Sequence, residues 1–223
     1  MTICFERREE LAPTIWQYYF RPERPIDFVA GQYAEFQLLQ PLGDPRGQQR
    51  TFTLTSLPDD ELVSFVVKCT APLSPYKQAL AQLQPGTELR LGEAMGDLIL
   101  PKLSSQPLVF VAGGIGMASF ASMLTLLSRR QEQREIYLFY ALRSRREQIY
   151  RELIDGYPLA LKQLIYAPNR LQAEEIASST PPDALVYLSG SQRFVEGLRS
   201  DLAALGTPHE RIVFDYFDGY AEL

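Results

Sequence analysis

The chain has 223 residues, 46% of them hydrophobic and 22% charged, which is ordinary for a globular protein with one large domain or two modest ones. Its formal net charge of −5 argues against a broad surface for nucleic acid or an anionic membrane. Two cysteines without a CxxC pair and a single histidine, His209, argue against an iron–sulfur cluster, a cysteine- or histidine-rich metal site and a Ser-His-Asp hydrolase.

The first part of the chain has the pattern of short strands separated by turn clusters such as "RPERP", "PLGDPRGQ" and "LPDD". The predicted strands are 2–8, 13–20, 32–39, 50–56, 61–69, 87–93 and 97–100. One helix interrupts them, because Ser74 is a good N-cap, Pro75 suits the first helical position and "YKQALAQL" continues the pattern. Closely spaced strands of this kind favour an antiparallel β-barrel or sandwich.

The rhythm changes after residues 101–107, "PKLSSQP", which resemble a linker. The run "LVFVAGG" is continuously apolar, as in a strand that is covered on both faces. The predicted helices are 117–130, 146–154, 171–178 and 192–205, and the predicted strands between them are 135–141, 161–166, 184–189 and 211–216. This alternation predicts a doubly wound parallel sheet, in which ligands bind outside the carboxyl ends of the strands. We therefore expect two domains, an antiparallel β-domain at 1–102 and an α/β domain at 103–223.

No stretch approaches the roughly 20 apolar residues that are needed to cross a bilayer. The start, "MTICFERREE", has no apolar core of a secretion signal. The two cysteines also fit a reducing compartment. We therefore expect a cytoplasmic protein without a membrane span, or one on the inner side of a membrane complex.

A glycine-rich loop opens the second domain. "VFVAGGIGMASF" places Gly113, Gly114 and Gly116, with Ile115 and Met117, between a strand and a helix. Glycines there allow a sharp turn and a close approach of ligand to main chain, and the following helix directs its N–H groups at a phosphate. The alternative is a purely structural tight turn. The position at the start of the alternating unit favours a dinucleotide phosphate.

The stretch "RTFTLTS" alternates like a strand, with Arg50, Phe52 and Leu54 on one side and the threonines on the other. One interpretation is a half-buried strand with a solvated edge. The other is a face that holds a ligand.

At this point the sequence resembles the ferredoxin–NADP reductase superfamily. "RTFTLTS" is similar to its flavin-binding R-x-[YF]-[ST] motif, and "GGIGMASF" is similar to its GGxGxxP nicotinamide-nucleotide loop. Further matching segments, in the same order, are "AGQYAEF", "VVKCTAPLS", "GEAMGDL", "YLSGS" and "FDYFDGY". The resemblance covers nearly the whole chain and implies a barrel that binds FAD, followed by a Rossmann-like domain that binds NADPH or NADH, with no metal.

The resemblance implies a role for individual residues. Arg50 would pair with the flavin pyrophosphate, Phe52 would stack on the isoalloxazine ring, and Thr53 would lie close to flavin N5. Ser74 would cap its helix and help to cradle the pyrophosphate, although Ala71-Pro72 stands where relatives often have glycines. The full set of implied cofactor-binding residues is Arg50, Thr51, Phe52, Thr53, Val66, Val67, Lys68, Ser74, Gly113, Gly114, Ile115, Gly116, Met117, Arg143, Ser144, Arg145, Gly190, Phe217 and Tyr220.

The implied catalytic residues are Thr53, Ser189 and Asp215. Ser189-Gly190-Ser191 replaces the Cys-Gly-Pro turn of relatives, so altered nicotinamide docking and slower hydride transfer are expected. Phe217 or Tyr220 would cover the other flavin face, or each would only pack an ordered terminus. Arg143, Ser144 and Arg145 in "YALRSRREQIY" favour the 2′-phosphate of NADPH, although a solvated charge run is the alternative.

These residues predict an FAD-dependent NAD(P)H oxidoreductase that moves a hydride between nicotinamide and flavin N5. Electrons would pass on to a ferredoxin or flavodoxin, or to a small acceptor such as free flavin. The alternative is an interaction subunit that keeps the fold without turnover, suggested by the departures at Phe52, Ala71-Pro72, Ser119 (where proline is usual) and Ser189. The reductase subunit of a larger complex is a third possibility.

Overall fold

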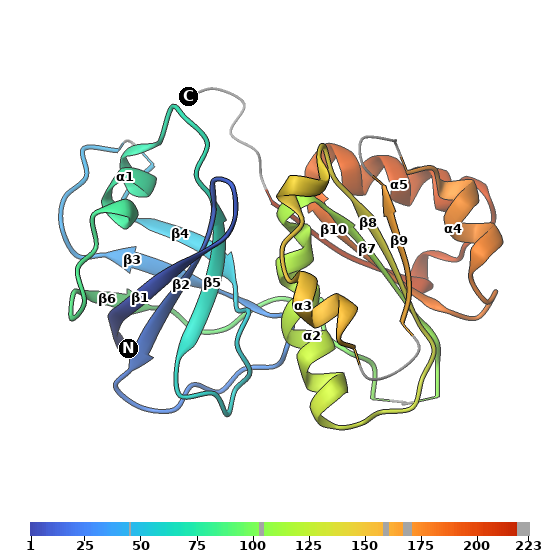
Figure 1. Cartoon of the computed structure of the whole chain (residues 1–223), viewed down its shortest axis with the longest axis horizontal. Coiled ribbons are helices and arrows are strands. Elements are labelled where there is room, and N and C mark those ends of the chain that lie inside the picture. The colour runs from blue at the N-terminus through green and yellow to red at the C-terminus, as the bar shows by residue number, and fades with distance from the viewer. Residues whose placement is uncertain (45, 103–104, 158–160, 167–170, 218–223) are drawn as a thin grey trace.

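The computed structural model in Figure 1 consists of two sheets that lie side by side, one antiparallel and one parallel. It describes residues 1–44, 46–102, 105–157, 161–166 and 171–217. The first sheet draws only on the amino-terminal half of the chain, and the second only on the carboxyl-terminal half. The domain boundary at residues 102/103 remains a prediction, and it falls in the connection between the two sheets.

The antiparallel sheet has six strands in the order β4-β3-β6-β1-β2-β5. Their bounds are β1 Thr2–Ala12, β2 Ile15–Pro22, β3 Tyr33–Leu38, β4 Gln49–Thr53, β5 Val63–Lys68 and β6 Glu88–Leu91. The sheet curls into a half-barrel, and just beyond β4 the N–H of Thr55 donates to the carbonyl of Ser64 at 2.8 Å. The two outer strands are therefore joined at one corner.

Helix α1, Pro75–Ala81, is the only α-helix described in this half, and its local sequence explains it. Ser74 caps the helix by accepting from the N–H of Lys77, and Pro75 occupies the first turn, as predicted. The predicted strand at 97–100 is wrong. Only a single bridge forms nearby, between Tyr33 and Met95. Leu98 is instead buried against the second half.

The parallel sheet has five strands in the order β11-β10-β7-β8-β9, which confirms the predicted doubly wound topology. Its strands are β7 Leu108–Gly113, β8 Ile136–Ala141, β9 Leu161–Tyr166, β10 Leu185–Ser191 and β11 Ile212–Phe217. Its α-helices are α2 Met117–Arg129, α3 Arg151–Asp155, α4 Ala173–Ser179 and α5 Gln192–Ala204. The predicted helix at 146–154 is mostly absent, because Tyr150 has a left-handed φ of 55° and α3 begins only after it. Short 3₁₀ turns lie at Gly114–Gly116, Arg145–Glu147 and His209–Arg211.

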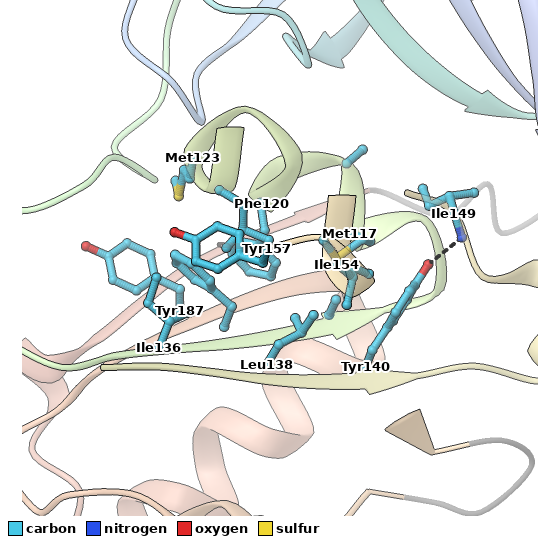
Figure 2. Packing of buried hydrophobic residues seen from close by; sticks show 14 of the residues in the cluster. Met117, Phe120, Met123, Ile136, Leu138, Tyr140, Ile149, Ile154, Tyr157 and Tyr187 are labelled. Carbon is cyan, nitrogen blue, oxygen red and sulfur yellow. Dashed lines mark hydrogen bonds between the residues drawn. The ribbon is translucent and has the colours of Figure 1, made fainter. Parts of the chain in front are cut away.

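The side chains of β7 point alternately into two apolar cores, because helices cover both faces of the sheet (Figure 1). Phe110 and Ala112 point to the face covered by α2 and α3, and Val109 and Val111 to the face covered by α4 and α5. Figure 2 shows the first of these cores, in which Met117, Phe120 and Met123 of α2 pack over Leu138 of β8. The continuously apolar sequence of β7 is thereby explained.

The core under α2 does not stop at the parallel half. It also contains a group of buried side chains from the antiparallel half, namely Ala12, Ile15, Ala30, Leu57, Val66 and Leu98. The interior of the half-barrel is a separate, aromatic-rich cluster. The two halves therefore share one continuous apolar layer along their seam.

None of the helices in the described parts of the chain has the length and apolar character that a membrane span requires.

Candidate functional site

A cavity of about 500 Å³ lies where the two halves meet, which is within the size range of small-molecule sites. Its lining includes eleven residues that the sequence predicts, namely Arg50, Thr51, Phe52, Thr53, Val66, Val67, Lys68, Ser74, Ile115, Asp215 and Phe217. It also includes Tyr33, Tyr76, Lys77, Ala118 and Tyr216, which the sequence reasoning does not identify. Residues that are up to 184 positions apart in the chain (Tyr33 and Phe217) thus meet in one space.

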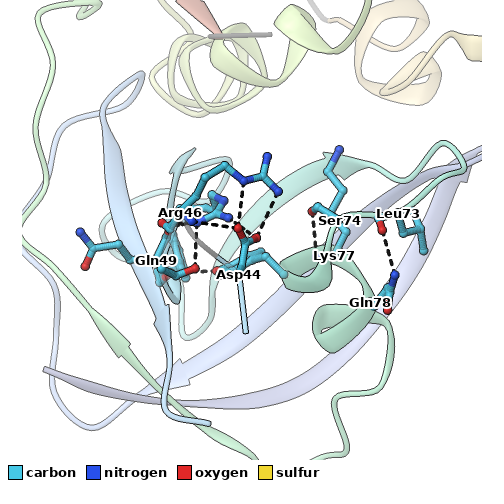
Figure 3. Close-up of polar contacts among 11 residues, drawn as sticks. Asp44, Arg46, Gln49, Leu73, Ser74, Lys77 and Gln78 are labelled. Carbon is cyan, nitrogen blue, oxygen red and sulfur yellow. Dashed lines mark hydrogen bonds and ion pairs between the residues drawn. The ribbon is translucent and has the colours of Figure 1, made fainter. Parts of the chain in front are cut away.

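Asp44 forms ion pairs with two arginines, of which Arg50 lines the cavity. Its side chain is fully buried and pairs with Arg50 Nη2 at 2.6 Å and with Arg46 Nε at 3.0 Å. Figure 3 shows the Asp44–Arg46 contact in the loop before β4. Hydrogen bonds from Arg46, reinforced by the charge of Arg50, hold the pKa of Asp44 below its usual value, although desolvation of the carboxylate opposes them. The guanidinium of Arg50 also lies 5.1 Å over the ring of Tyr76, so its direction is fixed.

Lys77 adds a second cation beside Ser74. Its Nζ donates to the carbonyl oxygen of Lys68 at 2.7 Å, and burial lowers the pKa of its ammonium group. Lys68 in turn pairs with Glu147 of the parallel half at 3.0 Å, which ties the two halves together. Sequence reasoning overlooked Lys77, although its place in the first turn of a helix capped by Ser74 is a usable signal.

Phe52 uses one face of its ring inside the half-barrel. It stacks on Phe65 with centroids 4.1 Å apart and planes only 7° from parallel, and its edge meets Phe36. It is also part of the cavity lining. The ring therefore stands between the aromatic core and the cavity, and its orientation is set by the core.

Three hydroxyl groups form a line that leads away from the cavity. Thr53 Oγ1 lies 3.5 Å from Ser119 Oγ, which lies 3.0 Å from Ser189 Oγ. Thr53 is part of the cavity lining, whereas Ser119 and Ser189 are fully buried behind it. Asp215 is the register partner of Ser189 on the neighbouring strand and also lines the cavity. The three predicted catalytic residues are thus brought together, with Ser119 as an added link.

The glycine loop divides into packed and open positions. A Cβ at Gly116 would come within 2.2 Å of the Ser189 carbonyl oxygen, and Cβ atoms at Gly113 and Gly190 would come within 2.7 Å and 2.9 Å of the Phe194 ring. Gly114 has φ +54°, and a Cβ there would meet nothing within 4 Å. Close packing therefore explains three of these glycines, and Gly114 alone faces open space ahead of α2.

Four further predicted residues, Met117, Arg143, Ser144 and Arg145, are absent from the cavity lining. The side chain of Met117 is fully buried in the core. Arg143, Ser144 and Arg145 are exposed after the carboxyl end of β8, where the Ser144 hydroxyl accepts from the N–H of Arg146 and caps a 3₁₀ turn. Tyr220 lies outside the described residues.

The cavity suits an anionic ligand with a flat ring. Arg50, Lys77 and the capped end of α1 offer positive charge and donors at one end, and Phe52 and Thr53 offer an aromatic face and a hydroxyl further along. The open backbone at Gly114 offers a second approach from the parallel half. These residues fit a flavin on the half-barrel side and a nucleotide on the other side.

Known proteins with sequences similar to this chain are described as oxidoreductase components and flavohemoproteins. Residues 110–200 match the family described as the oxidoreductase NAD-binding domain. Flavohemoprotein A from Dictyostelium discoideum is 23% identical, and the match covers 95% of this chain and 59% of that protein. The phenol 2-monooxygenase reductase component DmpP from Pseudomonas sp. is 29% identical, over 74% of this chain and 46% of the relative. The chain thus spans less than two thirds of the length of these curated relatives.

Solved structures match nearly the whole chain. The FAD/NAD-binding domain of nitric oxide dioxygenase from Vibrio cholerae superposes with a TM-score of 0.84 at 19% identity, covering 98% of each chain. A ferredoxin NADP⁺ reductase from Neisseria gonorrhoeae with bound FAD and NADP superposes with a TM-score of 0.81 at 16% identity, covering 97% of this chain and 98% of that chain. This likeness shows that the chain has the two-domain fold of these solved structures, and residues 110–200 are similar to the oxidoreductase NAD-binding domain family.

Proposed function

We propose that this chain is an FAD-dependent NAD(P)H oxidoreductase that moves a hydride between nicotinamide and flavin N5 and passes electrons on to an acceptor. The observation that carries the proposal is the shared cavity, in which Arg50, Phe52 and Thr53 of the half-barrel face Asp215 and Phe217 of the NAD-binding domain. The oxidoreductase NAD-binding family match supports the nucleotide side, and the structural neighbour with bound FAD and NADP supports both cofactors.

When bound, FAD supplies a ring that accepts a hydride and releases electrons singly or in pairs. The work of the protein is to position the reactants and shield them from water. Arg50 and Lys77 offer charge to a pyrophosphate, and Ser74 keeps the end of α1 directed at the same place. Phe52 limits where a flat ring can lie, because the Phe65 stack fixes its own plane.

Among the groups that line the cavity, the Thr53 hydroxyl and the Asp215 carboxyl are our candidates for holding or moving a proton. Val66 and Val67 line the cavity from β5, and their side chains pack into the two apolar cores on either side of that strand, which helps to exclude water. Phe217 lines the opposite part and is our candidate for covering the ring until nicotinamide enters. These roles follow the sequence expectation, and the shared lining of the cavity supports them.

On the nucleotide side, the open backbone at Gly114 and the start of α2 are the proposed seat of the NAD(P)H pyrophosphate. Arg143, Ser144 and Arg145 are exposed after β8, where they are free of the cavity lining and accessible to a ribose 2′-phosphate. We therefore propose NADPH as the preferred donor, with NADH as the alternative.

The acceptor is proposed as a ferredoxin- or flavodoxin-like protein, or an oxygenase component of the kind that the phenol hydroxylase reductases serve. The names of those relatives support electron delivery to a partner. A small acceptor such as free flavin is the alternative. Cys4 and Cys69 are both unpaired thiols, which supports a reducing, cytoplasmic location.

A non-catalytic interaction subunit is the second candidate, and one observation favours it. The groups expected to hold FAD already have protein partners, since Arg50 pairs with Asp44 and Phe52 stacks on Phe65. Such a subunit would bind its partner without reducible flavin.

The test is an anaerobic stopped-flow mix of FAD-loaded protein with NADPH and with NADH. Rapid bleaching of the flavin by either nucleotide, followed by reduction of ferricyanide, is expected. A protein that takes up no FAD would end the proposal. Bound flavin that neither nucleotide bleaches would favour the interaction subunit.

A further inference from the structure

We propose that Ser119 is a positioning residue that makes the Thr53 hydroxyl a hydrogen-bond donor into the cavity. The inference rests on the proposed function, because it concerns how the same site presents its proton to a flavin. Relatives usually carry proline at this position of the glycine loop motif, and proline has neither a hydroxyl nor an N–H. The role is therefore argued from this chain's own residues.

The three hydroxyls come from three different elements. Thr53 ends β4 of the half-barrel, Ser119 lies in the first turn of α2, and Ser189 lies on β10. The distance from Ser119 Oγ is 3.0 Å to Ser189, within the parallel half, and 3.5 Å to Thr53, across the seam. The longer contact is the one that depends on how the halves meet. Active-site hydrogen bonds are often long without substrate and tighten when it binds.

Counting the hydroxyl protons shows in which direction the hydrogen bonds among these three residues run. Three hydroxyls carry three protons, but two links use only two of them. Within the described part of the chain, Ser189 Oγ has Ser119 Oγ as its only hydrogen-bond partner, and Ser189 is fully buried. A buried hydroxyl proton without an acceptor is costly. Ser189 therefore donates to Ser119.

The direction then runs outward. Ser119 accepts from Ser189, so its own proton is donated to Thr53 Oγ1. Thr53 accepts that bond, and its remaining proton points to the one open side, which is the cavity that Thr53 lines. The reverse direction would leave the Ser189 proton without an acceptor in a fully buried place. The arrangement keeps Thr53 as a donor and disfavours it as an acceptor.

Ser122 provides a matched control one helical turn further along α2. It is also fully buried, and its Oγ also accepts across the seam, from the N–H of Gly31 at 3.1 Å. It is absent from the cavity lining and from the hydroxyl chain. Ser119→Ala and Ser122→Ala therefore remove similar buried groups, but only the first alters what Thr53 presents.

The experiment measures the N5 nitrogen resonance of isotopically labelled FAD bound to each variant, together with the flavin reduction rate. We expect Ser119→Ala to move the N5 resonance toward that of a ring without a donor. We also expect the reduction rate to fall about 10-fold, as for loss of one neutral hydrogen bond, with an unchanged Michaelis constant for the nucleotide. Ser122→Ala should lower thermal stability and leave both readouts unchanged. Ser189→Ala should act in the same direction as Ser119→Ala, but less, because Ser119 could then turn either way.

The outcomes separate the two proposals. An N5 resonance that is the same in wild type and in Ser119→Ala, in a protein that nicotinamide reduces, overturns the role of Ser119 and spares the function. If Ser119→Ala shifts the N5 resonance but neither nucleotide reduces the flavin, the proposed function is overturned and the role of Ser119 is spared. If Ser119→Ala does not fold, Ser189→Ala decides in the same way. Wild-type protein that binds no FAD overturns both.

Discussion

The half-barrel and the parallel half contribute to the cavity in different ways. The half-barrel supplies charged and aromatic side chains, and each is held by a protein partner: Arg50 by Asp44, Lys77 by the Lys68 carbonyl and Phe52 by Phe65. The parallel half supplies side chains from the loop before α2 and from the end of β11, and glycines that pack against β10 and α5 set the course of that loop. The comparison teaches that side-chain contacts position the cavity-lining groups of one half, whereas close packing of glycine main chain positions the loop of the other.

The largest expected effect comes from disrupting the close packing of Gly116 against β10. Gly116→Ala would place a Cβ 2.2 Å from the Ser189 carbonyl oxygen, which is a main-chain atom and cannot rotate away. We expect the free energy of unfolding to fall by about 3 kcal/mol, as in severe overpacking. Denaturant unfolding measures this. Gly197→Ala is the control, because a Cβ in that helix meets nothing within 4 Å, and it should raise stability by about 0.5–1 kcal/mol. Equal stability of Gly116→Ala and wild type would contradict the packing account.

The next effect tests the cavity-lining side chains of the half-barrel, beginning with Arg50. Arg50→Ala should weaken FAD binding by about 2–3 kcal/mol, as for a charge-assisted contact, and should leave the NAD-binding domain unchanged. Fluorescence titration with FAD measures the affinity. The control is Arg24→Ala, which removes an exposed arginine that does not line this cavity. Unchanged affinity in Arg50→Ala would remove this residue from the proposed site.

A smaller effect sharpens the role of Asp44 through pH. Its pKa is lowered in the folded state, so its contribution to stability is complete above the unfolded-state pKa and is lost as pH falls through the folded value. We therefore expect the urea midpoint to decline more steeply below about pH 4 in wild type than in Asp44→Asn. Identical pH profiles for the two proteins would show that the Arg46 and Arg50 contacts carry no such linkage.

The smallest effect concerns coenzyme choice. Arg143→Ala should raise the Michaelis constant for NADPH about 5-fold and spare NADH, because an exposed arginine contributes modestly to one phosphate contact. Steady-state kinetics with both nucleotides measures the ratio. Arg130→Ala, an equally exposed arginine just after α2, should change neither constant. Equal effects on NADPH and NADH would argue against a phosphate role.

Local chemistry made much of the fold predictable. The continuously apolar run of β7 and the Ser74-Pro75 start of α1 are both local signals, and both are confirmed. The strand expected at 97–100 failed because its apolar residues serve tertiary contacts. Leu98 packs into the seam, and the Ile99 carbonyl accepts from the Tyr187 hydroxyl at 2.9 Å. An apolar pattern alone does not distinguish that use from a strand.

The site was predictable only in part for a similar reason. Arg50, Phe52 and Thr53 are neighbours in one motif, so they reach the cavity together. The link from Thr53 through Ser119 to Ser189 joins residues 66 and 70 positions apart, across two domains. The period of a strand or helix says which face a side chain is on, but not which hydroxyl it will meet there. The same limit applies to Asp44, whose partners depend on the path of a loop.

The apolar layer shared by the two halves has a consequence for protein engineering. Chimeras that exchange the NAD-binding half between related reductases would have to carry matching partners for Ala12, Ile15, Ala30, Leu57, Val66 and Leu98. If α2 of the donor half has side chains of a different shape, cavities would form at the interface between the two halves. Each cavity would destabilise the contact between them. Modularity in this architecture is thus limited by shape at the boundary rather than by the linker that spans it.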